Sequence, residues 1–129
     1  MSAPALLMVN AFIGTANFKK LYQELGYAVV TEWSERKAIA FVRKTPPAVI
    51  VADFFHQTDF RDRLSNLESL LAAAQAAPTT KILVFYEPAH QAALDKVAER
   101  LRIDVALTMP VDEGKLRSTL KGWRPTTPN

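Results

Sequence analysis

The stretch Pro-Pro-Ala-Val-Ile-Val-Ala-Asp-Phe-Phe, residues 46–55, decides the architecture of this chain. Two prolines precede a run of apolar residues, and the run ends at Asp53. Proline keeps the residue before it out of the helical region, and successive apolar residues suit a strand buried on both faces. Residues 48–52 are therefore predicted to form a central strand of a parallel sheet, with Asp53 at its carboxyl end.

Four further short apolar runs have the same character, and they are separated by segments with helical spacing. The runs cover residues 5–9, 27–33, 82–86 and 104–108. The helical segments are predicted over residues 15–25, 35–45, 60–77, 88–101 and 113–123, with apolar residues three and four apart. Ser34, Asp59 and Asp112 are expected to cap helices at their start, Pro88 to begin one, and Gly26 to end one.

Strict alternation of strand and helix predicts an α/β fold: a five-stranded parallel sheet covered by helices on both faces, in three layers. A flavodoxin-like doubly wound order of 2-1-3-4-5 fits five such units. Functional residues of these folds lie beyond the carboxyl ends of the strands. For this chain those ends are residues 10–11, Asp53, residues 86–87 and residues 109–110.

Composition narrows the class of protein. A chain of 129 residues with 49% hydrophobic residues predicts one globular domain over residues 1–123, followed by a flexible tail at 124–129. The absence of cysteine excludes disulfides, thiolate metal sites and a cysteine nucleophile. The net charge of +3 is spread along the chain, which disfavours nucleic acid as a partner. With no signal-like or membrane-spanning segment, a cytoplasmic protein is expected.

Four segments together resemble the receiver domains of bacterial response regulators. They are ALLMVNAF (residues 5–12), PPAVIVADFF (46–55), KILVFYEP (81–88) and IDVALTMPVDEGKL (103–116). The likeness extends over about residues 5–123. It implies the doubly wound fold predicted above and a role in two-component or phosphorelay signalling.

The resemblance places Asp53 on the aspartate that accepts the phosphoryl group. The first strand of the family ends in two acidic residues, and here Asn10 and Ala11 hold those places. Phosphoryl transfer to a carboxylate needs a divalent metal to neutralise charge, and Mg²⁺ prefers carboxylate and other hard oxygen ligands. An amide and a methyl group beside one aspartate are a poor magnesium cage.

Three further positions depart from the family pattern. Tyr86 stands where Thr or Ser is usual, Ala106 where the switch aromatic is usual, and Met109 where a lysine pairs with the phosphate. Pro110 matches the proline that follows a cis peptide bond in the family. Because a thioether is only a weak acceptor, Met109 cannot replace the ammonium group. The resemblance therefore implies a degenerate receiver, or pseudo-receiver.

The face formed by the fourth helix, fifth strand and fifth helix is where receiver domains bind partners or a second copy. Its candidate residues here are His90, Leu94, Lys96, Arg117, Lys121 and Trp123. Trp123 has an equally good alternative role in closing the core. The expected partner is another signalling protein, with a homodimer through the last helix as a further possibility and no membrane partner.

We therefore expect a pseudo-receiver that acts as a protein-interaction module, without catalytic activity and without a cofactor or metal. One alternative is a receiver phosphorylated on Asp53, and a second is a small-molecule binder at the strand-end crevice. Asp53 also has a structural alternative, as an acceptor for loop amides. A metal site of His56 with nearby carboxylates, and a flavin site in residues 10–17, are both disfavoured because each lacks most of the groups required.

Overall fold

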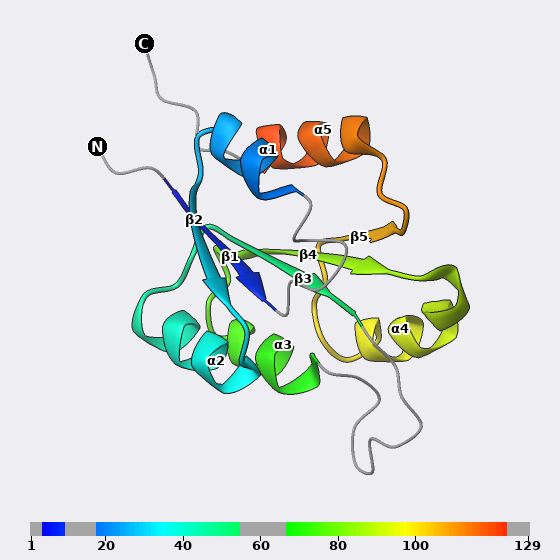
Figure 1. The fold of residues 1–129 in the computed structure, drawn as a ribbon. Helices are drawn as coiled ribbons and strands as arrows, with labels where there is room; N and C mark the ends of the chain where they lie inside the picture. The colour runs from blue at the N-terminus through cyan, green and yellow to red at the C-terminus, as the bar shows by residue number, and fades with distance from the viewer. Residues whose placement is uncertain (1–3, 10–17, 55–66, 124–129) are drawn as a thin grey trace.

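The computed structural model describes residues 4–9, 18–54 and 67–123 (Figure 1). Its five strands are β1 (Ala5–Val9), β2 (Ala28–Glu32), β3 (Val49–Asp53), β4 (Lys81–Tyr86) and β5 (Val105–Thr108). They form one sheet in the order β2-β1-β3-β4-β5, and every pair is parallel. The predicted order and the central position of the 48–52 strand are confirmed.

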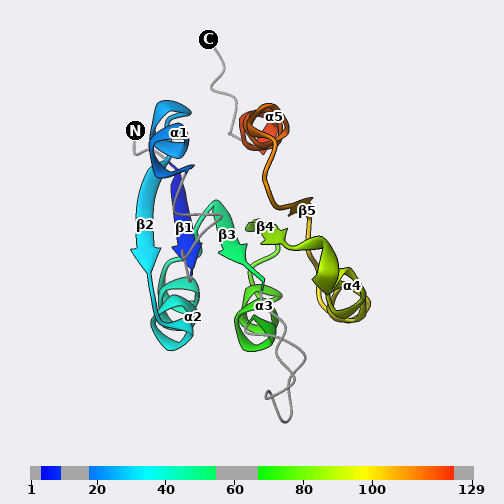
Figure 2. The same cartoon turned by 45° about the vertical axis from the view of Figure 1, so that its right-hand side comes forward.

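The helices are α1 (Lys19–Glu24), α2 (Glu35–Lys44), α3 (Glu68–Ala74), α4 (Gln91–Ala98) and α5 (Glu113–Trp123), with a 3₁₀ turn η2 (Pro88–His90) before α4. Figures 1 and 2 show α1 and α5 on one face of the sheet and α2, α3 and α4 on the other. None of the helices in the described ranges has the length and apolar character needed to cross a membrane.

The sheet divides the core into two halves because side chains alternate along each strand. Val49, Val51 and Phe85 pack with the apolar stripes of α1 and α5. Ile50 and Ala52 pack on the opposite face with those of α2, α3 and α4. All five residues of β3 are buried. The continuous apolar run predicts this for residues 49–52 of a central parallel strand, but not for Asp53.

Three of the predicted helix boundaries have the expected chemistry. The Ser34 hydroxyl accepts a hydrogen bond from the Lys37 amide at 3.4 Å at the start of α2. The Asp112 carboxylate accepts one from the Lys115 amide at 3.2 Å at the start of α5. Gly26 follows α1 with a φ of 94°, a backbone conformation that glycine adopts without steric cost.

Two helices differ from prediction. The third helix was expected over residues 60–77; residues 60–66 lie outside the described ranges, and α3 ends at Ala74, three residues before the predicted end. The fourth helix was expected over residues 88–101, but the 3₁₀ turn η2 occupies its start and α4 ends at Ala98. The predicted cap Asp59 lies outside the described residues. The described part of the first helix begins at Lys19, and the tail at 124–129 also lies outside the described residues.

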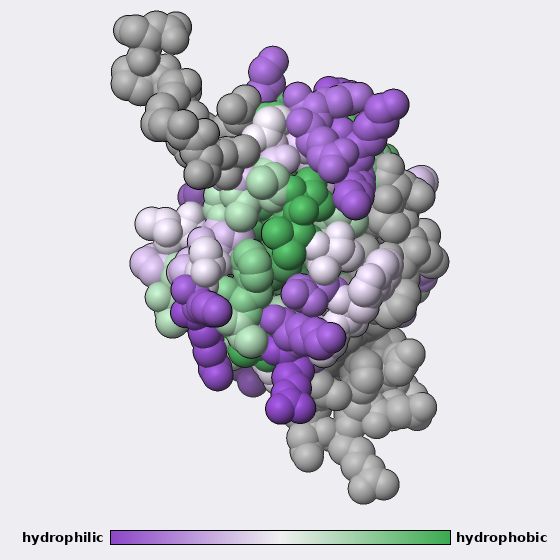
Figure 3. Space-filling model, turned by 60° about the vertical axis from the view of Figure 1, so that its left-hand side comes forward, coloured by the Kyte–Doolittle hydropathy of each residue, from purple (hydrophilic) through white to green (hydrophobic). Residues whose placement is uncertain are grey.

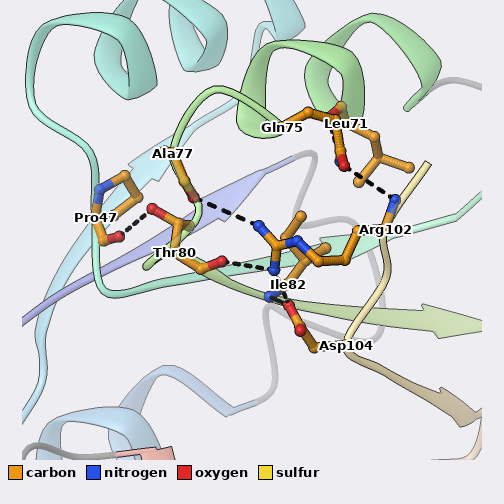
Figure 4. A network of polar contacts seen from close by, with 8 residues as sticks. All are labelled: Pro47, Leu71, Gln75, Ala77, Thr80, Ile82, Arg102 and Asp104. Atoms are coloured by element: carbon orange, nitrogen blue, oxygen red, sulfur yellow. Dashed lines mark hydrogen bonds and ion pairs between the residues drawn. The ribbon is translucent and has the colours of Figure 1, made fainter.

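A polar network fastens the amino-terminal ends of the strands, opposite the end that carries Asp53 (Figure 4). The Arg102 guanidinium donates to the carbonyls of Thr80 and Ala77 at 3.0 and 3.4 Å and pairs with Asp104. Asp104 in turn accepts from the Ile82 amide at 2.7 Å, and the Thr80 hydroxyl donates to the Pro47 carbonyl at 2.7 Å. The network therefore joins the chain segments at the starts of β3, β4 and β5.

Candidate functional site

The carboxyl ends of β3, β4 and β5 bring together residues that are far apart in sequence. Asp53 lies beside Phe85 in the register, and Tyr86 lies beside Thr108. Backbone hydrogen bonds extend this alignment beyond the strands, from the Phe54 amide to the Phe85 carbonyl and from the Met109 amide to the Tyr86 carbonyl, both at 2.8 Å. The predicted gathering of Asp53, Tyr86 and Met109 at one edge is therefore confirmed.

Asp53 is completely buried, with an exposed fraction of 0%. Ala52 and Phe54, its neighbours along the chain, pack into the core under α2, α3 and α4. Asp53 alternates with them, and so follows Val49 and Val51 toward the face covered by α1 and α5. Burial of a carboxylate is costly unless hydrogen bonds compensate it, so this position is specialised whatever its role.

Tyr22 of α1 shares this environment with Asp53. Its side chain is fully buried, and its hydroxyl has no hydrogen-bond partner in the described part of the chain. Burial raises the pKa of the Tyr22 hydroxyl well above its usual range, and the negative charge of Asp53 raises that pKa further. Tyr22 is therefore a neutral phenol that lies within electrostatic reach of the candidate aspartate.

Neutral and apolar groups surround the same part of the sheet. Phe18, just before α1, packs edge-on against Phe85, with ring centroids 6.0 Å apart at 74°. Met109 is half-buried and packs against the same core half as these rings. At the place where the family has a charged lysine, this chain thus packs a thioether into an apolar neighbourhood.

Tyr86 faces the other side of the sheet. It packs in the core half under α4, and its hydroxyl donates to the Gln91 side-chain carbonyl at 2.6 Å. Gln91 donates in turn to Asp95 at 2.9 Å. The hydroxyl at the position where the family has Thr or Ser is therefore hydrogen-bonded to the start of α4.

Ala106 and Pro110 complete the set of positions that the resemblance singled out. Ala106 lies beside Val84 in the register and is exposed, so no aromatic ring occupies this place on β5. The peptide bond between Met109 and Pro110 is cis, as the resemblance implied.

Several predicted residues lie outside the described ranges. These are Asn10 and Ala11 at the acidic positions, the loop at 10–17, and His56 of the disfavoured metal site. Within the ranges that are described, no three His, Asp or Glu side chains gather in a way that would hold a metal ion.

The candidate partner face is only partly available. Lys96 and Lys121 are exposed, and His90 is half-buried. Leu94 is 3% exposed and belongs to the core, so its inclusion among the partner-binding residues was wrong: it lies on the sheet-facing side of α4. Self-association through the last helix stays a prediction.

Arg117 and Trp123 of α5 have roles within the domain. The Arg117 guanidinium pairs with Glu24 of α1 at 3.0 Å and with Glu113 at 3.5 Å, and these carboxylates raise its pKa. Trp123 is half-buried against the core half under α1 and α5. The core-closing alternative for Trp123 therefore has a direct structural basis.

Sequence reasoning missed Tyr22 and Gln91 as members of the site. Tyr22 falls on the apolar stripe of its helix, where it was counted as core, and nothing in the spacing showed that it lies within electrostatic reach of Asp53. The prediction of a strand over residues 27–33 also placed Trp33 in the second strand. Trp33 instead follows β2 and has an exposed fraction of 62%.

No family model matches the sequence, and no curated protein matches it. Solved structures do. A CheY-like receiver domain from Methylobacillus flagellatus is 22% identical, with a TM-score of 0.70 over 95% of this chain and 100% of its own. The receiver domain of a sensor histidine kinase from Pseudomonas aeruginosa, with magnesium coordinated in its active-site cleft, is 17% identical, with a TM-score of 0.71 over 95% and 98%.

A third similar structure is the signal receiver domain of an HD domain-containing protein from Pseudomonas fluorescens. It is 16% identical, with a TM-score of 0.73 over 95% of this chain and 88% of that one. This chain therefore has the fold of CheY-like response-regulator receiver domains.

Proposed function

We propose that this chain is a signalling module of the receiver type that acts by binding another signalling protein, without accepting a phosphoryl group on Asp53. The complete burial of Asp53 carries the proposal, because phosphoryl transfer requires the donor to approach the carboxylate in line. A carboxylate with no exposed surface, beside a neutral phenol, is not positioned for that approach.

The chemistry of the neighbouring positions supports the same conclusion. Met109 provides no positive charge for a phosphoryl group, and Ala106 provides no ring that could move between two positions. The Tyr86 hydroxyl is already bonded to Gln91. A phosphate on Asp53 would therefore lack the lysine charge, the switch aromatic and the free hydroxyl that the family pattern provides. We propose instead that a partner recognises the shape of the domain.

Phosphorylation is testable directly. Incubation with Mg²⁺ and acetyl phosphate, followed by intact-mass spectrometry, is expected to leave the mass of the protein unchanged. A gain of one phosphoryl group that disappears in Asp53→Asn would establish the phosphoacceptor alternative instead.

A gain-of-function variant makes a negative result informative. Asn10→Asp, Ala11→Asp and Met109→Lys together restore the two acids and the lysine of the family pattern. We expect the triple variant to bind Mg²⁺ more tightly than the natural chain, because added carboxylates are the ligands that magnesium requires. Equal and tight Mg²⁺ binding by both proteins would argue that the natural site is already complete.

A further inference from the structure

A groove between α2 and α3 lies away from the strand-end site. It has a volume of about 420 Å³ and is open to solvent, and it is lined by Glu35, Arg36, Ile39, Ala40, Arg43 and Ser69. Figures 1 and 2 show the two helices side by side on the same face of the sheet. An open trough of this kind suits an elongated segment of a macromolecule better than an enclosed small molecule.

The α2 side of the groove carries two arginines. Arg36 and Arg43 are exposed, and within the described ranges neither guanidinium makes an ion pair. They are seven residues apart on one helix, which separates their Cα atoms by about 10 Å along the axis. Half-buried Ile39 and exposed Ala40 lie between them, so an apolar floor separates two positive ends.

The groove's own acidic residue is occupied elsewhere. Glu35 accepts a hydrogen bond from the Leu70 amide at 3.1 Å, in the first turn of α3, where a negative charge is favoured. This contact fixes α3 against α2 and so preserves the groove. It also leaves the groove with a net positive rim, because Ser69 on the opposite wall is neutral.

The surroundings extend this positive character. Lys37 and Lys44 are exposed on the same helix. The carboxylate of Glu68 on α3 is paired at 3.4 Å with Arg100, which follows α4. Figure 3 views the side of the molecule that carries β2 and α2, and it shows hydrophilic residues both above and below an apolar centre. Charge complementarity therefore selects an acidic occupant rather than a neutral or basic one.

We propose that the α2–α3 groove binds an acidic amphipathic helix of a partner protein, with carboxylates seven residues apart facing Arg36 and Arg43. Apolar residues between those carboxylates contact Ile39 and Ala40. The inference rests on the proposed function in one respect, that the partner is a protein. It does not depend on whether Asp53 accepts phosphate.

The test is an NMR titration of the ¹⁵N-labelled full chain with a synthetic helical peptide that has glutamates seven residues apart and leucines between them. We expect amide shifts to concentrate at residues 35–43 and 68–70. Arg36→Gln with Arg43→Gln should weaken binding about five- to tenfold, as two rim ion pairs would. The same peptide with glutamine in place of glutamate should bind as weakly to the natural chain.

Lys19→Gln with Lys20→Gln is the matched control, because it removes the same charge from the exposed surface of α1, on the other face of the sheet. Equal weakening of peptide binding by both double variants would show that the binding depends only on the net charge of the protein, and it would overturn the proposal. An absence of amide shifts at the groove would also overturn it. If single-stranded DNA produced shifts at the groove and the peptide did not, the partner would be a nucleic acid, and the proposal would be wrong. The acetyl phosphate experiment reads Asp53 alone, so either proposal can fail while the other stands.

Discussion

At the scale of single residues, burial and the charge of Asp53 determine how Tyr22 ionises. A buried phenol without a described acceptor lies near a buried carboxylate that raises its pKa. The neutral phenol loses little by staying buried, but its ionised form would pay both for desolvation and for repulsion from Asp53. The pair therefore links alkaline pH to the stability of the fold.

The first prediction concerns the pH dependence of the free energy of unfolding. Below about pH 10 Tyr22 is neutral in both states and contributes no slope. Above that, the unfolded chain releases the phenolic proton while the folded chain keeps it, so stability falls as pH rises. The slope from this group approaches about 1.4 kcal/mol per pH unit.

Tyr22→Phe should remove that part of the slope, as measured by urea unfolding at a series of pH values. At neutral pH the substitution should change stability by less than about 1 kcal/mol, because the hydroxyl has no described partner to lose. Parallel slopes for both proteins would show that Tyr22 ionises freely in the folded state.

At the scale of elements, both ends of α2 carry residues that stabilise a helix. Ser34 caps its start, and Arg43 and Lys44 occupy its last turn, where positive charge is favoured. Glu35 of the same first turn reaches across to α3. Residues 34–35 thus begin α2 and, through the Glu35 carboxylate, connect it to α3.

The second prediction tests the cap. Ser34→Ala should lower the free energy of unfolding by about 0.5–1 kcal/mol, toward the low end of capping effects because the bond is long at 3.4 Å. Ser34→Asp retains an acceptor at the same position and should keep most of the stability. A loss of equal size in both variants, measured by urea unfolding, would mean that the hydroxyl makes no capping contribution.

The elements show where sequence reasoning succeeds. Apolar runs such as 48–52 predicted all five strands, because a buried parallel strand needs apolar residues at successive positions. Ser34, Asp112 and Gly26 predicted helix ends through local hydrogen-bonding and backbone chemistry. The end of the third helix was predicted wrongly, because the Gln-Ala-Ala of residues 75–77 suits a helix while the chain turns after Ala74 to place the buried Ala77 and Thr80.

At the scale of the whole molecule, the two edges of the sheet have different tasks. The amino-terminal edge is held by the Arg102 network, which joins three loops through backbone carbonyls (Figure 4). The carboxyl-terminal edge carries Asp53.

The third prediction follows from this division. Arg102→Met should destabilise the protein by about 2 kcal/mol, because it leaves partly buried carbonyls and the Asp104 carboxylate without their donor. Arg100→Met removes an exposed ion pair with Glu68, and should cost less than about 0.5 kcal/mol. Thermal or urea unfolding of the two variants compares them directly, and a similar cost for both would remove the network's special role.

The site was predictable in position but not in environment. Register along a parallel sheet follows from the strand pattern, so Asp53, Tyr86 and Met109 could be placed at one edge. The exposure of a side chain depends on helices packed from distant parts of the chain. Sequence alone therefore did not show that Asp53 and Leu94 are buried, or that Arg36 and Arg43 flank a groove.

The most direct measurement of the central claim is an NMR titration of the ¹⁵N-labelled protein with Mg²⁺ and beryllofluoride, a mimic of the acyl phosphate. We predict that the amide signals of Asp53, Phe54, Tyr86 and Met109 stay unchanged through the titration, as they would in Asp53→Asn. Saturable shifts at these amides in the natural chain, absent from Asp53→Asn, would contradict the account and establish a working phosphoacceptor site.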